Sequence, residues 1–190
     1  LSRTLTEIYG HKGLVSWGGT AFEYLMPNIN IPTFESTIID ESCRLSVLSQ
    51  IKYSKKLGIP WGISEAAYSK KDLYGNYQYK TFGIPWLGLK RGLGSEAVIS
   101  PYSTIMALTI SSDFALNNLH KIEKEGGIGK YGFFDSIDYV PKKTVVKTYM
   151  AHHQGMIITS IDNCVNDNIF QKRFMNKDDY DSVLDDMRLK

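Results

Sequence analysis

The most regular pattern in the chain is TIIDESCRLSVLSQIKYSKKLGIP, residues 37–60. Apolar residues recur there at helical spacing, at Ile38, Leu45, Val47, Leu48 and Ile51. Thr37 and Asp40 have the spacing of an N-terminal capping box. Gly58, with Pro60 two residues later, is typical of a helix end. We therefore expect a long helix over residues 38–57 and a fold built mainly from helices.

Further helices are expected on both sides of this one. Ser100 and Pro101 are typical of a helix start, and Gly126-Gly127 of a helix end. The expected helices cover residues 19–26 (short), 101–110, 112–125, 149–165, 167–175 and 178–188. Residues 130–148 favour extended structure with a turn at Pro141. The coarse class is all-α, with a minor β-hairpin.

Two segments are expected to be loops. Residues 1–36 are rich in Gly and contain two Pro, and residues 59–96 form a long connection. The second segment is dense in rings, namely Trp61, Tyr68, Tyr74, Tyr77, Tyr79, Phe82 and Trp86. Because long structureless connections in compact domains are usually functional, we expect these loops to border a cleft at one end of the helices.

The composition of the chain excludes several classes of protein. The chain has 190 residues, 43% of them hydrophobic, a net charge of +2 and two Cys. These values exclude wholesale disorder and a disulfide scaffold, and they do not favour nucleic-acid binding. No apolar run is long enough to cross a membrane. The chain starts at Leu1 without Met or a signal peptide, which suggests a mature product or a fragment.

Carboxylates close to aromatic residues are the first candidates for catalysis. They are Glu23, Glu41, Glu65 and Asp135. Glycoside cleavage uses two carboxyl groups, and sugars stack on aromatic rings. Structural roles are the alternative: Asp40 and Glu41 lie where a helix start favours acids, and Asp135 could anchor a turn. Glu23 and Glu65 lie among apolar residues, where a carboxylate needs a partner or a function.

The segment Tyr149-Met150-Ala151-His152-His153-Gln154-Gly155-Met156 is the second candidate. Its two imidazoles and its amide could hold sugar hydroxyl groups, or could form a buried polar patch. Adjacent helical His side chains point about 100° apart, and no HExxH motif or matching Cys cluster exists, so we expect no metal. The chain also lacks a P-loop ending and a GxSxG elbow, and we expect no cofactor.

These motifs resemble one known family. The resemblance covers roughly residues 8–175 and is carried by residues 17–27, Asp40-Glu41-Ser42-Cys43-Arg44, Pro60-Trp61-Gly62-Ile63-Ser64-Glu65, residues 77–83, Gly88-Leu89-Lys90-Arg91-Gly92, Tyr131-Gly132-Phe133 and residues 149–156. The chain resembles the glucoamylase-like domain of cyclic β-1,2-glucan synthases.

The resemblance implies an (α/α)6 toroid, as in glucoamylases and β-1,2-glucanases. Our helices account for about half of such a toroid, so we expect residues 1–190 to be one domain that forms its C-terminal half. In relatives an acidic motif expected to carry the general acid lies upstream of Leu1, and Glu often stands at the position of Asp135. The family is thought to cut and rejoin linear β-1,2-glucan, beside a membrane-bound glucosyltransferase region and a phosphorylase-like region.

The expected function is therefore glycoside hydrolysis or transglycosylation of a β-glucan, with sugar-binding residues Trp17, Trp61, Tyr77, Gln78, His152, His153 and Gln154. The first alternative is a non-catalytic carbohydrate-binding or structural fragment, and the second is a β-glucoside phosphorylase. We expect the partner to be a β-glucan, with no nucleic acid and no membrane contact by this segment. A homodimer or a missing N-terminal half would cover its open apolar faces. The expected location is the cytoplasm or a membrane-anchored parent protein.

Overall fold

The long helix lies where the sequence places it. The computed structural model describes residues 4–175, and within them α2 (Ile38–Leu57) is the longest helix. The Asp40 N–H donates to Thr37 Oγ1 at 3.3 Å, and Gly58 ends the helix with φ of 71°. Both end signals are thus confirmed, because a capping hydroxyl and a left-handed glycine satisfy backbone groups that a helix end leaves open.

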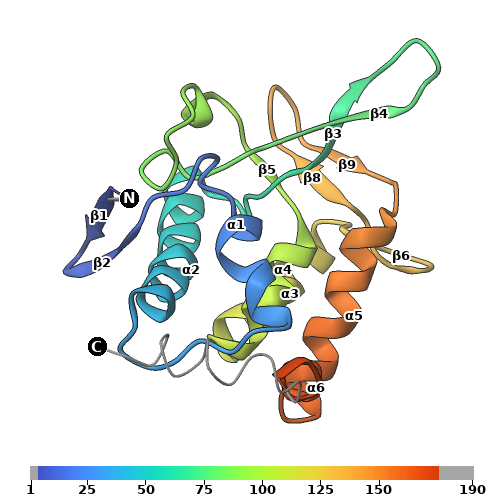
Figure 1. The fold of residues 1–190 in the computed structure, drawn as a ribbon. Helices are drawn as coiled ribbons and strands as arrows, with labels where there is room; N and C mark the ends of the chain where they lie inside the picture. The colour runs from blue at the N-terminus through green and yellow to red at the C-terminus, as the bar shows by residue number, and fades with distance from the viewer. Residues whose placement is uncertain (1–3, 176–190) are drawn as a thin grey trace.

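The remaining helices include one that is fully buried. They are α1 (Ala21–Leu25), α3 (Pro101–Met106), α4 (Ser112–Lys124), α5 (Ala151–Val165) and α6 (Ile169–Met175), with short 3-10 turns at Met26–Ile29, Leu93–Ser95 and Ala107–Thr109. All six residues of α3 are buried, and α3 packs against α1, α4 and α5 (Figure 1). The helix expected over residues 178–188 lies outside the described residues.

Strands are more numerous than the single hairpin that we expected. They are β1 (Leu5–Ile8), β2 (His11–Leu14), β3 (Ala66–Lys71), β4 (Tyr77–Lys80), β5 (Val98–Ile99), β6 (Ile128–Gly129), β7 (Gly132–Phe133), β8 (Ser136–Asp138) and β9 (Thr144–Val146). They form three antiparallel hairpins, β1–β2, β3–β4 and β6–β7, and one antiparallel sheet of order β5-β8-β9. The all-α description is therefore corrected to a helical fold with small antiparallel sheets.

The β3–β4 hairpin is the largest of these additions, and it falls in a segment expected to be a loop. Figure 1 shows it projecting from the body of the molecule. Its turn is local: Asp72 Oδ1 accepts hydrogen bonds from the N–H groups of Tyr74 and Asn76. Its base is held from a distance, because Asp135 and Asp138 accept hydrogen bonds from the Ala67 and Ser69 N–H groups at 2.8 and 3.1 Å.

Glycines allow two loops to cross in close contact. A Cβ atom at Gly83 would lie 1.7 Å from the Gly18 carbonyl oxygen. The Ile84 N–H donates to the Gly19 carbonyl at 2.9 Å, and Gly19 has φ of 65°. The turn at Trp17 to Gly19 is therefore fixed by direct backbone packing, which only residues without a side chain permit.

The outer side of α5 is apolar. Ile158, Ile161 and Val165 are exposed, whereas the buried residues of this helix are His153, Met156, Ser160 and Asn163. The expected homodimer would cover such a surface, and it stays a prediction that light scattering can test. Within residues 4–175, none of the helices combines the length and hydropathy that a membrane crossing requires.

Candidate functional site

The segment that leads to Glu65 is fixed by side chains from three helices. Gln50 of α2 bonds both the N–H and the carbonyl of Ile63, each at 2.7 Å. Asn118 of α4 bonds the N–H and the carbonyl of Trp61 at 2.9 and 2.7 Å. Tyr102 of α3 donates to the Glu65 carbonyl at 3.0 Å. The backbone of Glu65 is thereby placed, while its carboxyl group stays half-buried at the base of β3.

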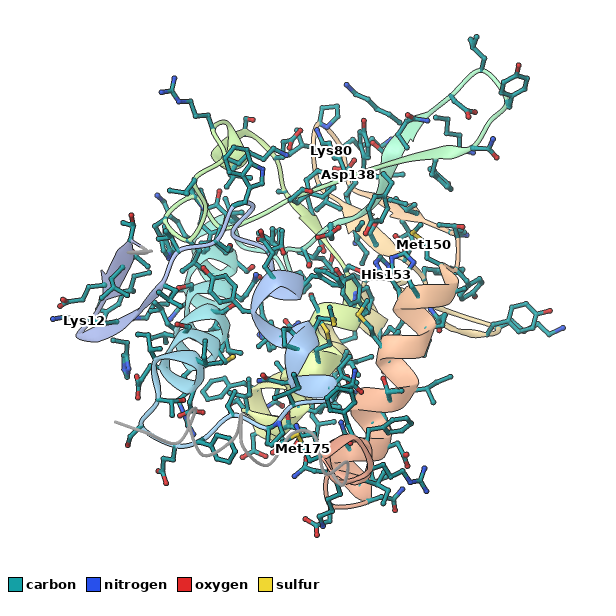
Figure 2. All side chains as sticks on the ribbon, viewed as in Figure 1. Lys12, Lys80, Asp138, Met150, His153 and Met175 are labelled. Atoms are coloured by element: carbon teal, nitrogen blue, oxygen red, sulfur yellow. The ribbon has the colours of Figure 1, made fainter. Side chains whose placement is uncertain are left out.

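Tyr79 connects this carboxyl group to a histidine. Its hydroxyl lies 3.4 Å from Glu65 Oε2 and 3.4 Å from His153 Nε2. Figure 2 shows His153 at the N-terminal end of α5, below the base of the β3–β4 hairpin. Residues from β4, α5 and the start of β3 thus meet at one place.

The buried carboxylate of Asp135 contacts the ring nitrogen of His153 that does not face Tyr79. Asp135 Oδ1 lies 2.6 Å from His153 Nδ1, and both side chains are almost fully buried. The other Asp135 oxygen accepts the Ala67 N–H at 2.8 Å. The ring of Tyr102 stacks on the imidazole, with centroids 3.9 Å apart and planes at 18°. Asp135 therefore orients His153 and has no exposed oxygen with which to meet a substrate.

The electrostatics of this cluster shift the pKa values of three of its side chains. Burial raises the pKa of Glu65, the Tyr79 hydrogen bond opposes that rise, and the charge of Glu23 adds to it. Burial, assisted by the charges of Glu65 and Asp135, raises the pKa of Tyr79. Burial and the neighbouring His153 lower the pKa of His152. Glu65 thus keeps its proton to higher pH than an ordinary glutamate, and His152 loses its proton at lower pH than an ordinary histidine.

Glu23 has a structural role. Its carboxylate accepts hydrogen bonds from the Gly18 N–H at 2.9 Å, from Ser16 Oγ at 2.9 Å and from the Thr20 N–H at 3.0 Å. With the Glu23 N–H donating to Thr20 Oγ1, these contacts form a capping box at the start of α1. A catalytic role for Glu23 stays a prediction, and its charge reaches Glu65.

Glu41 lies away from the cluster. It belongs to the first turn of α2, at the opposite end of that helix from Gly58 and the segment leading to Glu65 (Figure 1). Beside it, Asp40 is buried and pairs with Arg44 at 2.9 Å. Both acids therefore serve the start of α2, and the structure does not bring Glu41 to the site.

The two predicted tryptophans differ in exposure. Trp17 is 69% exposed and adjoins Gly18, whose N–H binds Glu23. Trp61 is 6% exposed and belongs to the core. Because a sugar needs an open ring face, Trp17 remains a candidate platform, whereas the placement of Trp61 is corrected to a packing role.

The other predicted binding residues lie around Tyr79. The rings of His152 and Tyr79 have centroids 6.1 Å apart, and Tyr77 lines a shallow pocket together with Tyr79. Gln78 is exposed between them, on the other face of β4. Gln154 uses its amide to donate to the Phe133 carbonyl at 3.2 Å. The structure thus gathers Tyr77 and both histidines, while Gln154 supports the neighbouring loop.

Our interpretation of the sequence missed Tyr79 and Tyr102 as site residues. Tyr79 is one of many rings in its segment, although it follows Tyr77 at the two-residue spacing of a strand. Tyr102 lies in a helix start that gives no sign of its contact with His153. No cluster of three or more His, Cys, Asp or Glu side chains suited to a metal occurs among residues 4–175.

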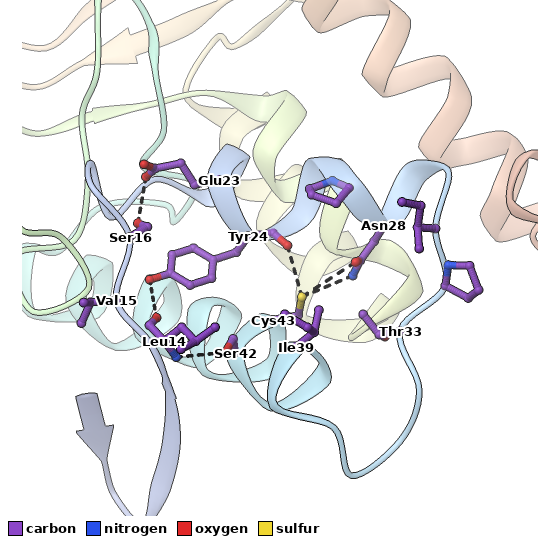
Figure 3. A pocket seen from close by; sticks show the side chains of 13 residues that line it. Leu14, Val15, Ser16, Glu23, Tyr24, Asn28, Thr33, Ile39, Ser42 and Cys43 are labelled. Carbon is purple, nitrogen blue, oxygen red and sulfur yellow. Dashed lines mark hydrogen bonds between the residues drawn. The ribbon is translucent and has the colours of Figure 1, made fainter. Parts of the chain in front are cut away.

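A separate apolar pocket lies between β2, α1 and α2. It has a volume of about 250 Å³, and its polar groups already bond one another: Tyr24 donates to the Leu14 carbonyl, and Cys43 Sγ contacts Asn28 and the Tyr24 carbonyl (Figure 3). Burial raises the pKa of Cys43 to about 11, so its thiol stays protonated. This pocket has no free reactive group and shares only Glu23 with the surroundings of Glu65.

Comparisons with solved structures agree with this architecture. An endo-β-1,2-glucanase from Chitinophaga pinensis, in complex with sophorotriose and glucose, matches with a TM-score of 0.72 and 17% identity, covering 97% of this chain and 46% of the glucanase. A β-1,2-glucanase from Parabacteroides distasonis matches with a TM-score of 0.64 and 18% identity, covering 96% of this chain and 26% of that enzyme. The helical arrangement is thus that of part of a glucanase-type toroid.

Sequence comparisons identify the family. The chain is 42% identical over 172 residues to the cyclic β-(1,2)-glucan synthase NdvB of Rhizobium meliloti (strain 1021), which covers 87% of this chain and 6% of the synthase. It therefore spans a small part of that relative. The model of the Glycoamylase family, described as "Putative glucoamylase", matches residues 1–178. The chain belongs to the Glycoamylase family and is a glucoamylase-like domain related to a segment of cyclic β-1,2-glucan synthase.

Proposed function

We propose that this chain provides part of the active site of a glycoside hydrolase or transglycosylase acting on β-1,2-glucan. The observation that carries the proposal is Glu65, a half-buried carboxyl group with a raised pKa and a tyrosine within hydrogen-bond reach. The names of two relatives support the substrate class, since one is a cyclic β-(1,2)-glucan synthase and the other an endo-β-1,2-glucanase.

Glu65 is best suited to act as the general acid. A raised pKa lets its carboxyl group hold a proton to higher pH than an ordinary glutamate does, and that proton can be given to the glycosidic oxygen as the bond breaks. The resemblance to the synthases placed the general acid upstream of Leu1, so this assignment to Glu65 is our own. Trp17, Tyr77 and His152 would hold sugar rings around it.

The partner carboxylate is proposed to come from outside these 190 residues. Asp135 is buried and bonded through both oxygens, Glu23 holds the capping box of α1, and Glu41 lies elsewhere. Glycoside cleavage by this route needs a second carboxyl group as base or nucleophile. In the absence of that group, the chain would bind glucan without cleaving it, and this is the second candidate function.

The test is incubation with linear β-1,2-glucan, followed by separation of the products by size. We compare the 190-residue chain with the same chain extended upstream in its natural sequence. Shorter linear products indicate hydrolysis, cyclic products indicate transglycosylation, and a sugar phosphate formed only with added phosphate indicates a phosphorylase. Binding without products in both proteins would favour the carbohydrate-binding candidate.

Two matched variants test whether Glu65 is the general acid. In the protein extended upstream, E65Q keeps the shape of the side chain but cannot donate the proton, so we expect glucan cleavage to fall by at least about a hundredfold. E41Q is the control, because Glu41 lies at the far end of α2. If E65Q retained full activity, Glu65 would not be the general acid.

A further inference from the structure

Tyr79 has one hydroxyl proton and two partners. Glu65 Oε2 and His153 Nε2 each lie 3.4 Å from its oxygen. A tyrosine hydroxyl donates one hydrogen bond and can accept others. When Tyr79 donates to one partner, it is therefore free to accept only from the other. Both distances are long for hydrogen bonds, as is common before substrate tightens a catalytic site.

Asp135 fixes which ring nitrogen of His153 faces Tyr79 and which one carries a hydrogen. Its carboxylate lies 2.6 Å from His153 Nδ1, so Nδ1 carries a hydrogen and donates to it. The nitrogen that faces Tyr79 is then Nε2. It accepts from Tyr79 when the imidazole is neutral and donates to Tyr79 when the imidazole is protonated.

The four side chains Glu65, Tyr79, His153 and Asp135 therefore have two hydrogen-bond arrangements with the same total number of protons. In the first, Glu65 is protonated and donates to the Tyr79 oxygen, Tyr79 donates to Nε2, and His153 is neutral. In the second, the Glu65 proton has moved to the Tyr79 oxygen and the proton of Tyr79 has moved to Nε2. Glu65 is then a carboxylate and His153 an imidazolium, while Asp135 is negative in both arrangements.

We propose that Tyr79 is a positioning residue that joins Glu65 to the His153–Asp135 pair, so that Glu65 and His153 share a proton. When the shared proton rests on Glu65, it is the one given to the glycosidic oxygen, which leaves a Glu65 carboxylate and a neutral His153. Glu65 then takes a proton from the attacking hydroxyl group, and the pair again holds one proton. This inference rests on the proposed role of Glu65, and it assigns to the buried pair a task that packing alone does not explain.

Other charged and titratable groups surround the relay. Glu23 on α1 adds negative charge near Glu65 and favours its protonated form. His152 lies beside His153, with ring centroids 4.1 Å apart, and Tyr102 covers one face of the imidazole. None of the three stands between the hydroxyl of Tyr79 and its two partners, so substitution at Tyr79 interrupts the relay specifically.

The experiment is a pH titration of the folded chain by NMR, which requires no enzymatic activity. Histidine ring nitrogens labelled with ¹⁵N report donor or acceptor state, and the sequence contains only four His. Labelled glutamate carboxyl carbons report Glu65, assigned with E65Q. We expect His153 Nε2 and the Glu65 carboxyl to show the same two titration steps, as strongly coupled groups do.

Y79F tests the connection, and Y74F is its matched control. Both remove one hydroxyl from the β3–β4 hairpin, but Tyr74 is exposed at the tip. In Y79F the Nε2 signal should lose most of the step shared with Glu65, leaving only a Coulomb effect, and the pKa of Glu65 should rise because a donor to its carboxylate is gone. Y74F should keep both steps.

Two results would overturn the inference. One is a wild-type Nε2 signal without a step at the Glu65 titration. The other is a Y79F signal that keeps more than half of that step. Should either occur while E65Q still abolishes glucan cleavage, the proposed function stands and the relay fails. Shared titration that Y79F removes, in a protein extended upstream that cleaves no glucan, would support the relay and refute the proposed function.

Discussion

Replacement of Gly83 by Ala should loosen the turn that carries Trp17. The new Cβ would lie 1.7 Å from the Gly18 carbonyl oxygen, so that turn must retreat by about 1.3 Å to reach an allowed contact. Besides the local bond from the Gly19 N–H to Ser16 Oγ, three hydrogen bonds of 2.9 Å hold it to other segments: the Gly18 N–H to Glu23, the Ile84 N–H to Gly19 and the Lys90 N–H to Trp17. Loss of two neutral bonds and one to a carboxylate costs about 3–5 kcal/mol.

The assay is chemical and thermal unfolding followed by circular dichroism. For a chain of this size, we expect the Tm to fall by about 6–20 °C. G155A is the matched control, because a Cβ at Gly155 in α5 meets nothing within 4 Å. Alanine there should stabilise the helix by about 0.5–1 kcal/mol. A G83A protein within about 1 kcal/mol of wild type would show that the two backbones do not cross as described.

The remaining predictions concern three other places. Because the pKa of Glu65 is raised on folding, its contribution to stability is fully present below the usual Glu pKa and is lost as pH rises through the folded value; E65Q should remove that loss and be more stable than wild type at pH 7 in urea titrations. W17A should weaken glucan binding by about tenfold without lowering the Tm, whereas W61A should cost about 3–5 kcal/mol of stability; equal Tm values for both would contradict their assigned positions. At pH 8 iodoacetamide should label the exposed Cys164 and spare Cys43 until the protein unfolds, as mass spectrometry of the peptides would show.

The helices could be predicted because their signals are local. In α2 the apolar spacing, the Thr37 cap and Gly58 all lie within the helix or beside it. The β3–β4 hairpin gave no such signal, because its outer residues are polar or exposed on both faces. Its base is held by Asp135, which bonds the N–H of Ala67 from 68 residues away. A contact of that kind becomes visible only when the chain has folded.

The site was predictable to the same extent. Glu65 attracted attention because it is a carboxylate among apolar residues, and the structure makes it half-buried. Glu23 was interpreted in the same way, but the Thr20-to-Glu23 spacing is that of a capping box and would have indicated its structural role. The contact between Tyr79 and His153 joins residues 74 positions apart, so no local pattern could pair them.

The position of Glu65 depends on how three helices pack together. Gln50, Asn118 and Tyr102 belong to α2, α4 and α3, and each fixes a different point of the short segment that ends in this residue. A small displacement of any one helix is transmitted to the carboxyl group through a single hydrogen-bonding side chain. Substitutions at contacts between these helices, distant from any sugar, should therefore alter the titration of Glu65 before they unfold the protein.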